Sequence, residues 1–327
     1  MAGFLHGTYL LGGKMDNLVF CLNATVPIFI MMILGMIFKK IKWIDESFAS
    51  KMNSFVFKVA LPVMIFNDLA TTDISESWDG GFVLFCFVAT FLSIAIAYLV
   101  SLIFKREIRG EFVQGCYRSS AAILGIAFIQ NIYGTSGMAP MMMIGSVPLY
   151  NVMAVILLSV FKPGQSGLDA ATIRKTLIGI AKNPIIIGIV AGLLWSLTGI
   201  TLPQIISKST SMLGRVATPM GLLAMGASFD IHKAFNQLKP AITASFLKLV
   251  GFVAIFMPIA IHIGFGAQQL VALLVMLGSS TTVASFVMSK SMGHEGTVSS
   301  SVVMLTTLFC GFTLTIWLYI LRSMGFV

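Results

Sequence analysis

Long apolar stretches alternate with short polar segments along almost the whole chain. A helix crosses the hydrocarbon core of a bilayer with about 20 mostly apolar residues. Stretches near that length occupy residues 17–38, 49–70, 81–104, 112–133, 139–161, 176–198, 204–228, 240–263, 268–289 and 298–321. The segments between them are too short for a further soluble domain. The pattern therefore predicts an all-α integral membrane protein with ten transmembrane helices.

The second half of the chain repeats the first half weakly but in register. A shift of 157 positions places Pro27 on Pro184 and Gly35 on Gly192. The same shift places Ser50, Lys51, Ser54, Lys58, Val59, Ala60 and Pro62 on Ser207, Lys208, Ser211, Arg215, Val216, Ala217 and Pro219. A slightly larger shift aligns the serine pairs 119–120 and 279–280. Because each half has an odd number of spans, five, the halves would be inverted relative to each other, as in many secondary transporters.

The repeat sets the expected domain organisation. The sequence Lys-Pro-Gly-Gln-Ser-Gly after the fifth span breaks any helix, and Asp169 or Thr172 would cap the next one. We divide the chain into an N-terminal extension (1–16), a first five-helix repeat (17–161), an inter-repeat cytoplasmic loop (162–172) and a second five-helix repeat (173–327). Met15, which directly precedes the first span, is an alternative start of the protein.

Composition and charge agree with a membrane protein. Hydrophobic residues make up 57% of the chain and charged residues 10%, whereas a soluble protein carries about a quarter charged residues. The net charge is +9, and the cations gather after alternate spans: Lys39, Lys40, Lys42, Lys105, Arg106, Arg109, Lys162, Arg174, Lys175, Lys233, Lys239 and Lys290. This positive-inside bias predicts both termini outside the cytoplasm. The basic excess is thus a topology signal and does not indicate a nucleic-acid partner.

Two spans carry runs of small and hydroxyl residues that favour an interruption of the helix. The fourth span contains Ser119, Ser120 and Gly125, and the ninth contains Ser279, Ser280 and Thr281. In inverted-repeat transporters, interrupted helices meet near the bilayer midplane, where the positive N-terminal ends of half-helices face an anion. We therefore predict a substrate site at these residues. Close packing between helices uses the same residue types and is the structural alternative.

Cations inside spans are the second group of candidates. Lys58 and Arg215 occupy equivalent positions in the repeat, each four residues before a proline, Pro62 or Pro219. An intramembrane cation is costly unless it is paired, reaches the interface or lines a wet cavity. We expect Lys58 and Arg215 to give a cavity positive potential and the prolines to shape the helices beside it. Arg118 and Lys248 are weaker candidates for the same role, and interfacial snorkelling is the alternative.

The distribution of acids points to the charge of the substrate. Asp68 and Asp230 lie near the ends of spans, and no acid lies in the middle of one. Cation carriers commonly use a buried carboxylate, so its absence beside buried cations favours an anionic substrate. Proton coupling stays open, because a buried lysine can titrate. No phosphate-binding loop, H-E-x-x-H motif or cysteine pattern for a metal is found, so we expect neither an enzyme nor a cofactor or metal.

Several segments resemble the auxin efflux carrier family, which includes plant auxin exporters and bacterial malate or malonate permeases. These are Met15-Asp16-Asn17-Leu18, Val26-Pro27-Ile28, the segment 55–62, Lys182-Asn183-Pro184 with Gly192, and Ala217-Thr218-Pro219 with 222–226. The resemblance extends from residue 15 to the end. It implies two inverted five-helix repeats with crossing broken helices 4 and 9, a bacterial plasma-membrane location, and a fold with which a homodimer is compatible.

The sequence thus favours a secondary transporter, a permease or efflux carrier, of small organic anions such as mono- or dicarboxylates. It would work by alternating access in the lipid bilayer, with H⁺ or Na⁺ as a candidate coupling ion. One alternative is a sodium- or proton-coupled cation exchanger or symporter of the same broad fold. The other is a membrane sensor that binds a ligand without transporting it.

Overall fold

The computed structural model describes residues 26–71, 78–121, 126–134, 137–164 and 170–327, and all regular structure in these ranges is helical. Several helices begin at capping side chains that accept a backbone N–H. Asp45 accepts from Phe48, and Asp79 accepts from Phe82. Asn183 caps the helix that starts at Pro184, a position where proline is favoured. These three polar side chains therefore mark where their helices start.

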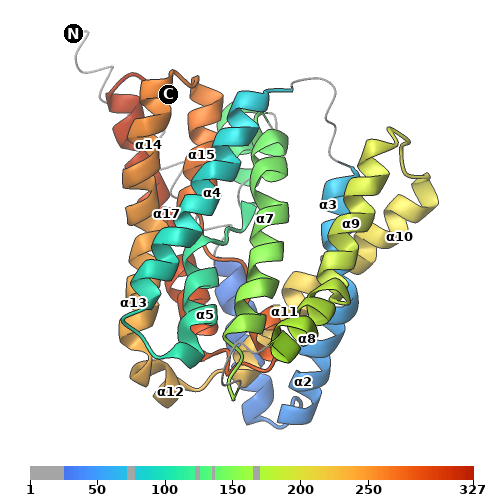
Figure 1. The fold of residues 1–327 in the computed structure, drawn as a ribbon. Helices are drawn as coiled ribbons and strands as arrows, with labels where there is room; N and C mark the ends of the chain where they lie inside the picture. The colour runs from blue at the N-terminus through green and yellow to red at the C-terminus, as the bar shows by residue number, and fades with distance from the viewer. Residues whose placement is uncertain (1–25, 72–77, 122–125, 135–136, 165–169) are drawn as a thin grey trace.

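The helices form two groups that lie side by side (Figure 1). The first group shares one apolar core. It comprises α4 (Gly80–Ser101), α5 (Arg106–Tyr117), α6 (Ile126–Tyr133), α7 (Ala139–Val160), α13 (Leu238–Phe246), α14 (Phe252–Ile263), α15 (Ala267–Gly278) and α17 (Thr297–Ser323). Large apolar side chains such as Phe82, Phe112 and Phe252 fill this core, and polar side chains such as Glu111, Gln114 and Lys248 are buried in the same bundle.

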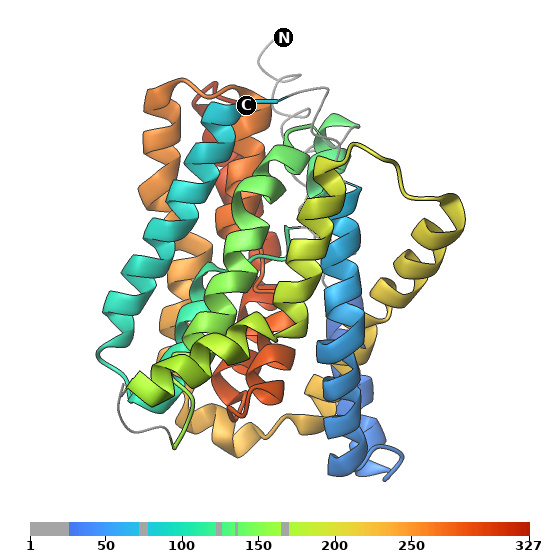
Figure 2. The same ribbon diagram turned by 45° about the vertical axis from the view of Figure 1, so that its right-hand side comes forward.

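The second group is built around another apolar core. It comprises a helix over 26–40, α2 (Glu46–Phe55), α3 (Leu61–Ala70), α9 (Pro184–Leu197), α10 (Gln204–Arg215), α11 (Ala217–Ser228) and α16 (Ala284–Ser291). The helix α10 stands at the outer edge of this group (Figure 2). The helix α7 contributes to both cores. Two shorter helices, α8 (Ala170–Ala181) and α12 (Ile231–Asn236), lie near the lower ends of the groups in Figure 1.

Five helices of the described chain are long and apolar enough to span a bilayer. They are Glu46–Ala70, Gly80–Ser101, Ala139–Val160, Leu238–Ile263 and Thr297–Ser323. The other five predicted spans are covered by shorter helices or begin within undescribed residues: 26–40, α5 with α6, α8 with α9, α10 with α11, and α15 with α16. The helices thus follow the predicted apolar stretches, while the number of membrane crossings remains a prediction.

Both predicted helix-shaping prolines follow an irregular turn. A π-helical segment, η1 (Val56–Ala60), precedes Pro62, and the separation between α10 and α11 at Val216 precedes Pro219. Proline has no N–H for the carbonyl four residues earlier, so the regular hydrogen-bond ladder fails at Lys58 and Arg215. A second π-helical segment, η3 (Leu247–Gly251), interrupts the long helix formed by α13 and α14.

One close helix crossing in the second group depends on glycine. A Cβ atom on Gly226 of α11 would lie 2.0 Å from the carbonyl oxygen of Met32. On the facing helix, a Cβ on Gly35 would lie 2.3 Å from the carbonyl oxygen of Leu223. Real Cβ atoms do not approach other atoms this closely, so the two backbones touch through these glycines in the way typical of membrane helices.

Candidate functional site

The two segments predicted to be interrupted are interrupted, and they contact each other. The helix α5 ends at Tyr117 and residues 118–120 are non-helical, while α15 ends at Gly278 and residues 279–283 are non-helical. The backbone N–H of Ser120 donates to the carbonyl oxygen of Ser280 at 2.9 Å. We call these two non-helical segments the junction. Two half-helices therefore end here with carbonyl groups that have no partner within their own helix.

Lys248 supplies donors to those helix ends. It lies in η3 and is fully buried. Its Nζ donates to the carbonyl oxygen of Met276 at 3.0 Å, to the carbonyl oxygen of Tyr117 at 3.5 Å, and to Oγ of Ser119. A cation at the negative C-terminal end of a helix is stabilised by the helix dipole, and Lys248 sits at two such ends. Its ammonium group is thus used in holding the junction together.

Arg118 is the second buried cation of the junction, and its bonding is less complete. The side chain is 3% exposed. Nη2 donates to Oδ1 of Asn151 at 2.9 Å and Nη1 lies 2.7 Å from Sδ of Met288. Its Nε has no partner among the described residues. A guanidinium group has five donors in a planar fork that matches a carboxylate, so Arg118 keeps capacity for a further acceptor.

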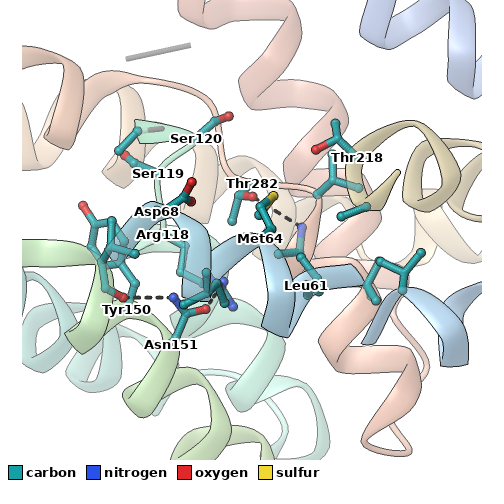
Figure 3. Close-up of a pocket in the computed structure, with 18 residues that line it drawn as sticks. Leu61, Met64, Asp68, Arg118, Ser119, Ser120, Tyr150, Asn151, Thr218 and Thr282 are labelled. Carbon is teal, nitrogen blue, oxygen red and sulfur yellow. Dashed lines mark hydrogen bonds between the residues drawn. The ribbon is translucent and has the colours of Figure 1, made fainter. Parts of the chain in front are cut away.

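Arg118 lines a cavity of about 60 Å³ next to the junction (Figure 3). One water molecule needs about 10–15 Å³ measured in this way, so the space suits a few waters or a small organic acid. We call it the junction cavity. Its walls are formed by Val56, Leu61, Met64, Ile65, Asp68, Arg118, Ser119, Ser120, Ala121, Val147, Tyr150, Asn151, Ala217, Thr218, Thr282, Val283, Ala284 and Val287.

The N-terminal end of α16 also faces the junction cavity through Val283 and Ala284. The amides of Ser285 and Phe286 already donate within the first turn, to the carbonyls of Thr282 and Val283. The helix end therefore acts on a bound anion through its dipole more than through these two N–H groups.

Asp68 of α3 lines the same cavity. The sequence placed this acid near the end of a span, and we took the absence of a mid-span carboxylate as a sign of an anionic substrate. The structure places a carboxyl group in the wall of the cavity, which its position near the end of the span did not indicate. The charge of the substrate stays a prediction. The described site contains two buried cations, Arg118 and Lys248, and one carboxyl group.

The structure brings only part of the predicted site to the cavity. Ser119 and Ser120 line it, whereas Ser279, Ser280 and Thr281 are buried within the junction and do not line it. Thr281 supports the junction: its Oγ1 donates to the carbonyl of Gly115 at 2.7 Å, and its amide donates to Oγ1 of Thr306 at 3.0 Å. These contacts hold the interrupted segment against α5 and α17.

The other predicted residues lie elsewhere. Lys58 and Arg215 are exposed and are not among the lining residues. Pro62 and Pro219 do not line the cavity, although Leu61 and Thr218 beside them do. Gly125 lies outside the described residues. The cavity is also lined by Arg118, a weaker candidate in the sequence, and by Asp68, which was placed only near the end of a span. Tyr150 and Asn151 line it too, and no motif in the sequence marks them.

A second cavity, of about 450 Å³, lies one helical turn away. All its lining residues are polar: Lys39, Glu46, Ser50, Asn53, Ser54, Ser228, Asp230, Lys233, Lys290, Ser291, Glu295 and Thr297. Ion pairs join Lys39 to Glu46 at 3.9 Å and Lys233 to Glu295 at 3.8 Å. The amide of Lys233 donates to Asp230, and this hydrogen bond lowers the pKa of that carboxyl. We call this space the polar cavity.

The two cavities share the same helices. Asn53 and Ser291 line the polar cavity, while Val56 and Val287 line the junction cavity. These pairs are three and four residues apart, which is about one turn of helix. An apolar layer with Val56 and Val287, about one turn thick, therefore lies between the junction cavity and the polar cavity.

A buried, charged junction between apolar helices, with a polar space leading towards it, defines a multi-pass membrane protein of the transport class. A family model described as membrane transport protein matches residues 20–318. The chain belongs to this family, which confirms the resemblance to the auxin efflux carriers. A comparison with curated proteins found no match.

Among solved structures, the chain is similar to the sodium proton antiporter MjNhaP1 from Methanocaldococcus jannaschii, determined at pH 8. The TM-score is 0.65, and the match covers 95% of this chain and 99% of the antiporter chain. Only 12% of the aligned residues are identical. The similarity therefore concerns the fold and leaves the substrate open.

Proposed function

We propose that the protein is a secondary transporter of small organic anions, such as mono- or dicarboxylates, and that the junction cavity is its substrate site. The observation that carries this proposal is the state of Arg118. It is a buried guanidinium group that lines a cavity and has an unused donor. Buried charges in membrane proteins are costly and mark substrate or ion pathways. A carboxylate in the cavity would satisfy this charge with bidentate hydrogen bonds.

The neighbouring residues fit an anionic ligand. Ser119, Ser120 and Asn151 offer polar groups on the same wall, and the positive end of α16 adds a favourable dipole. The junction residues Ser279, Ser280 and Thr281 would shape the site without lining the cavity. We propose the same role for Gly125, which lies outside the described residues. Lys58 and Arg215 would act only at longer range, as positive potential, because both are exposed.

The architecture that we propose is two inverted five-helix repeats, 17–161 and 173–327, joined by the cytoplasmic loop 162–172. The repeat in the sequence and the contact between the two interrupted segments support it. Both termini would lie outside the cytoplasm of a bacterial plasma membrane. The polar cavity, with Lys39, Lys233 and Lys290 among its walls, would then open to the cytoplasm, as the positive-inside rule requires.

Alternating access would operate through the apolar layer between the two cavities. In the described arrangement the layer with Val56 and Val287 separates the two cavities by about one helical turn. Opening it by moving α16 against η1 would connect the substrate site to the cytoplasm, while closing it would allow access from the opposite side. Because α16 and η1 share the apolar core of the second group, such a change would be a rearrangement of packed helices within that group.

A second candidate is a cation exchanger or symporter. Asp68 in the cavity wall favours it, because cation carriers rely on intramembrane carboxylates. The solved structure with a similar fold is, by its title, a sodium proton antiporter. Two buried cations beside one carboxyl group make this candidate the weaker one, because a cation would have to enter a site that is already positive.

The test is uptake into proteoliposomes of a labelled acid panel, namely malate, malonate, lactate, succinate and indole-acetate, with and without proton and sodium gradients. Saturable flux of at least one acid is expected in proteoliposomes. Liposomes without protein are the control and should show no saturable flux. Sodium or proton flux that needs none of the acids, from protein with a normal unfolding transition, would favour the cation carrier. Saturable binding without any flux would favour a membrane sensor.

A further inference from the structure

The junction cavity contains an acidic and a basic side chain, and both affect how a substrate carboxylate can bind. Asp68 and Arg118 belong to the wall of one cavity of about 60 Å³ (Figure 3). An organic acid that fills so small a space contacts several of the lining residues at once. If its carboxylate bound to Arg118, a second carboxylate would lie close to Asp68. Two carboxylates that share one site do not both remain ionised at low energetic cost, and one of them retains a proton.

Two titratable side chains share the cavity wall with Asp68 among the described residues. The elements packed against α3 are η1, α9 and α10, and the cavity is completed by α7, α11, α16 and the junction. The helices α9 and α11 carry no titratable residue. The titratable side chains on the remaining elements are Lys58, Arg118, Tyr150, Lys208, Arg215 and Lys290. Of these, only Arg118 and Tyr150 line the cavity, and Lys58, Lys208, Arg215 and Lys290 are exposed.

We propose that Asp68 is the proton-binding residue that couples the carrier to the proton gradient. The proposal rests on the proposed function, because it assigns the coupling ion of that same site. The protein binds one proton on a carboxylate oxygen of Asp68 and one substrate carboxylate at Arg118, and both are released on the other side of the membrane. The O–H bond that forms on entry breaks on release, so one proton moves with each anion.

The empty site fits the same scheme. Without substrate, ionised Asp68 offsets the charge of Arg118 across the cavity, so the empty carrier does not hold an uncompensated guanidinium. Substrate replaces Asp68 as the counter-charge only when Asp68 is protonated. Lys248 does not take part, because its ammonium group already donates to Ser119 and to the carbonyls of Met276 and Tyr117.

The experiment compares wild type, Asp68→Asn and Glu107→Gln in proteoliposomes with the acids of the panel. Asparagine resembles the protonated carboxyl group in shape and charge, and Glu107 is an exposed acid outside both cavities. Two assays are run for each protein. One measures exchange of labelled for unlabelled acid without a pH gradient, and the other measures accumulation driven by a pH gradient with sodium absent.

We expect Asp68→Asn to keep exchange within about threefold of wild type and to lose accumulation driven by the pH gradient. The apparent affinity of the wild type should fall about tenfold per pH unit above the titration of the coupling group, as uptake of one proton requires. In Asp68→Asn it should not change with pH, while Glu107→Gln should match wild type in both assays.

Accumulation by Asp68→Asn as in wild type would overturn this proposal and leave the proposed function intact. Loss of exchange in a variant with a normal unfolding transition would also overturn it, because Asp68 would then serve in binding. If Asp68→Asn does not fold, a pH-sensitive dye inside wild-type vesicles decides: acid entry without proton entry overturns the coupling role. If wild type carries none of the acids, the proposed function fails first and the coupling role fails with it.

Discussion

The two buried cations of the junction differ in what surrounds them. Lys248 has three oxygen acceptors, two of which are the carbonyls at the ends of α5 and α15. Arg118 has one oxygen acceptor, one sulfur contact and an unpartnered Nε, and it lines a cavity. A saturated cation holds a structure together, whereas an unsaturated one is ready for a ligand. The comparison favours a structural role for Lys248 and supports the proposed substrate-binding role of Arg118.

The largest effect on stability is expected from Lys248→Met. The substitution leaves the buried carbonyls of Met276 and Tyr117 without their donor and removes the charge that complements two helix dipoles. We expect the free energy of unfolding to fall by about 3 kcal/mol, measured by denaturation of the purified protein in detergent. Lys239→Met, an exposed site at the start of the same long helix, is the matched control. Equal stability of the two variants would contradict the structural role of Lys248.

A smaller loss is expected from Ser119→Ala. The Oγ of Ser119 contacts both Nζ of Lys248 and the carbonyl of Met276, so its removal should cost about 1 kcal/mol. Ser120 joins the other interrupted segment through its backbone N–H, which alanine retains. Ser120→Ala should therefore unfold within about 0.5 kcal/mol of wild type. If Ser120→Ala were the more destabilised variant, the hydrogen-bond pattern of the junction would need revision.

The smallest effect is expected from the cations outside the cavity. Lys58→Met and Arg215→Met should change the transport rate by about threefold or less, because neither side chain lines the junction cavity and a charge interaction weakens with distance. Initial uptake rates in proteoliposomes provide the measurement, with protein amounts matched. Abolished transport in either variant would restore the role that their matched positions in the repeat predicted.

The interruptions of the helices could be predicted from sequence because they are local. Runs such as Ser119-Ser120 and Gly278-Ser279-Ser280 weaken a helix wherever they occur. Their mutual contact followed from the repeat, which placed them at equivalent positions. The same reasoning located the irregular turns before Pro62 and Pro219, since a missing N–H disrupts the ladder in any surroundings.

The direction in which a side chain points was not predictable in the same way. Lys58 and Lys248 both lie in π-helical segments, yet the first is exposed and the second is fully buried. Each residue adds about 100° of rotation in a regular helix, so the extra residue of a π turn changes the face that the following residues present. The π turn of η1 therefore changes the side of α3 on which Asp68 lies. Packing against neighbouring helices then sets the direction in which the side chain points.

The most direct test of the central claim is uptake of the acid panel by Arg118→Met beside wild type. The account predicts saturable flux in wild type and a loss of at least about 100-fold in the variant, as expected when a buried charge–carboxylate contact of about 3 kcal/mol is removed. Unfolding of both proteins is measured in parallel, so that flux is compared only between folded proteins. Wild-type flux from folded Arg118→Met would contradict the claim that the junction cavity binds the substrate.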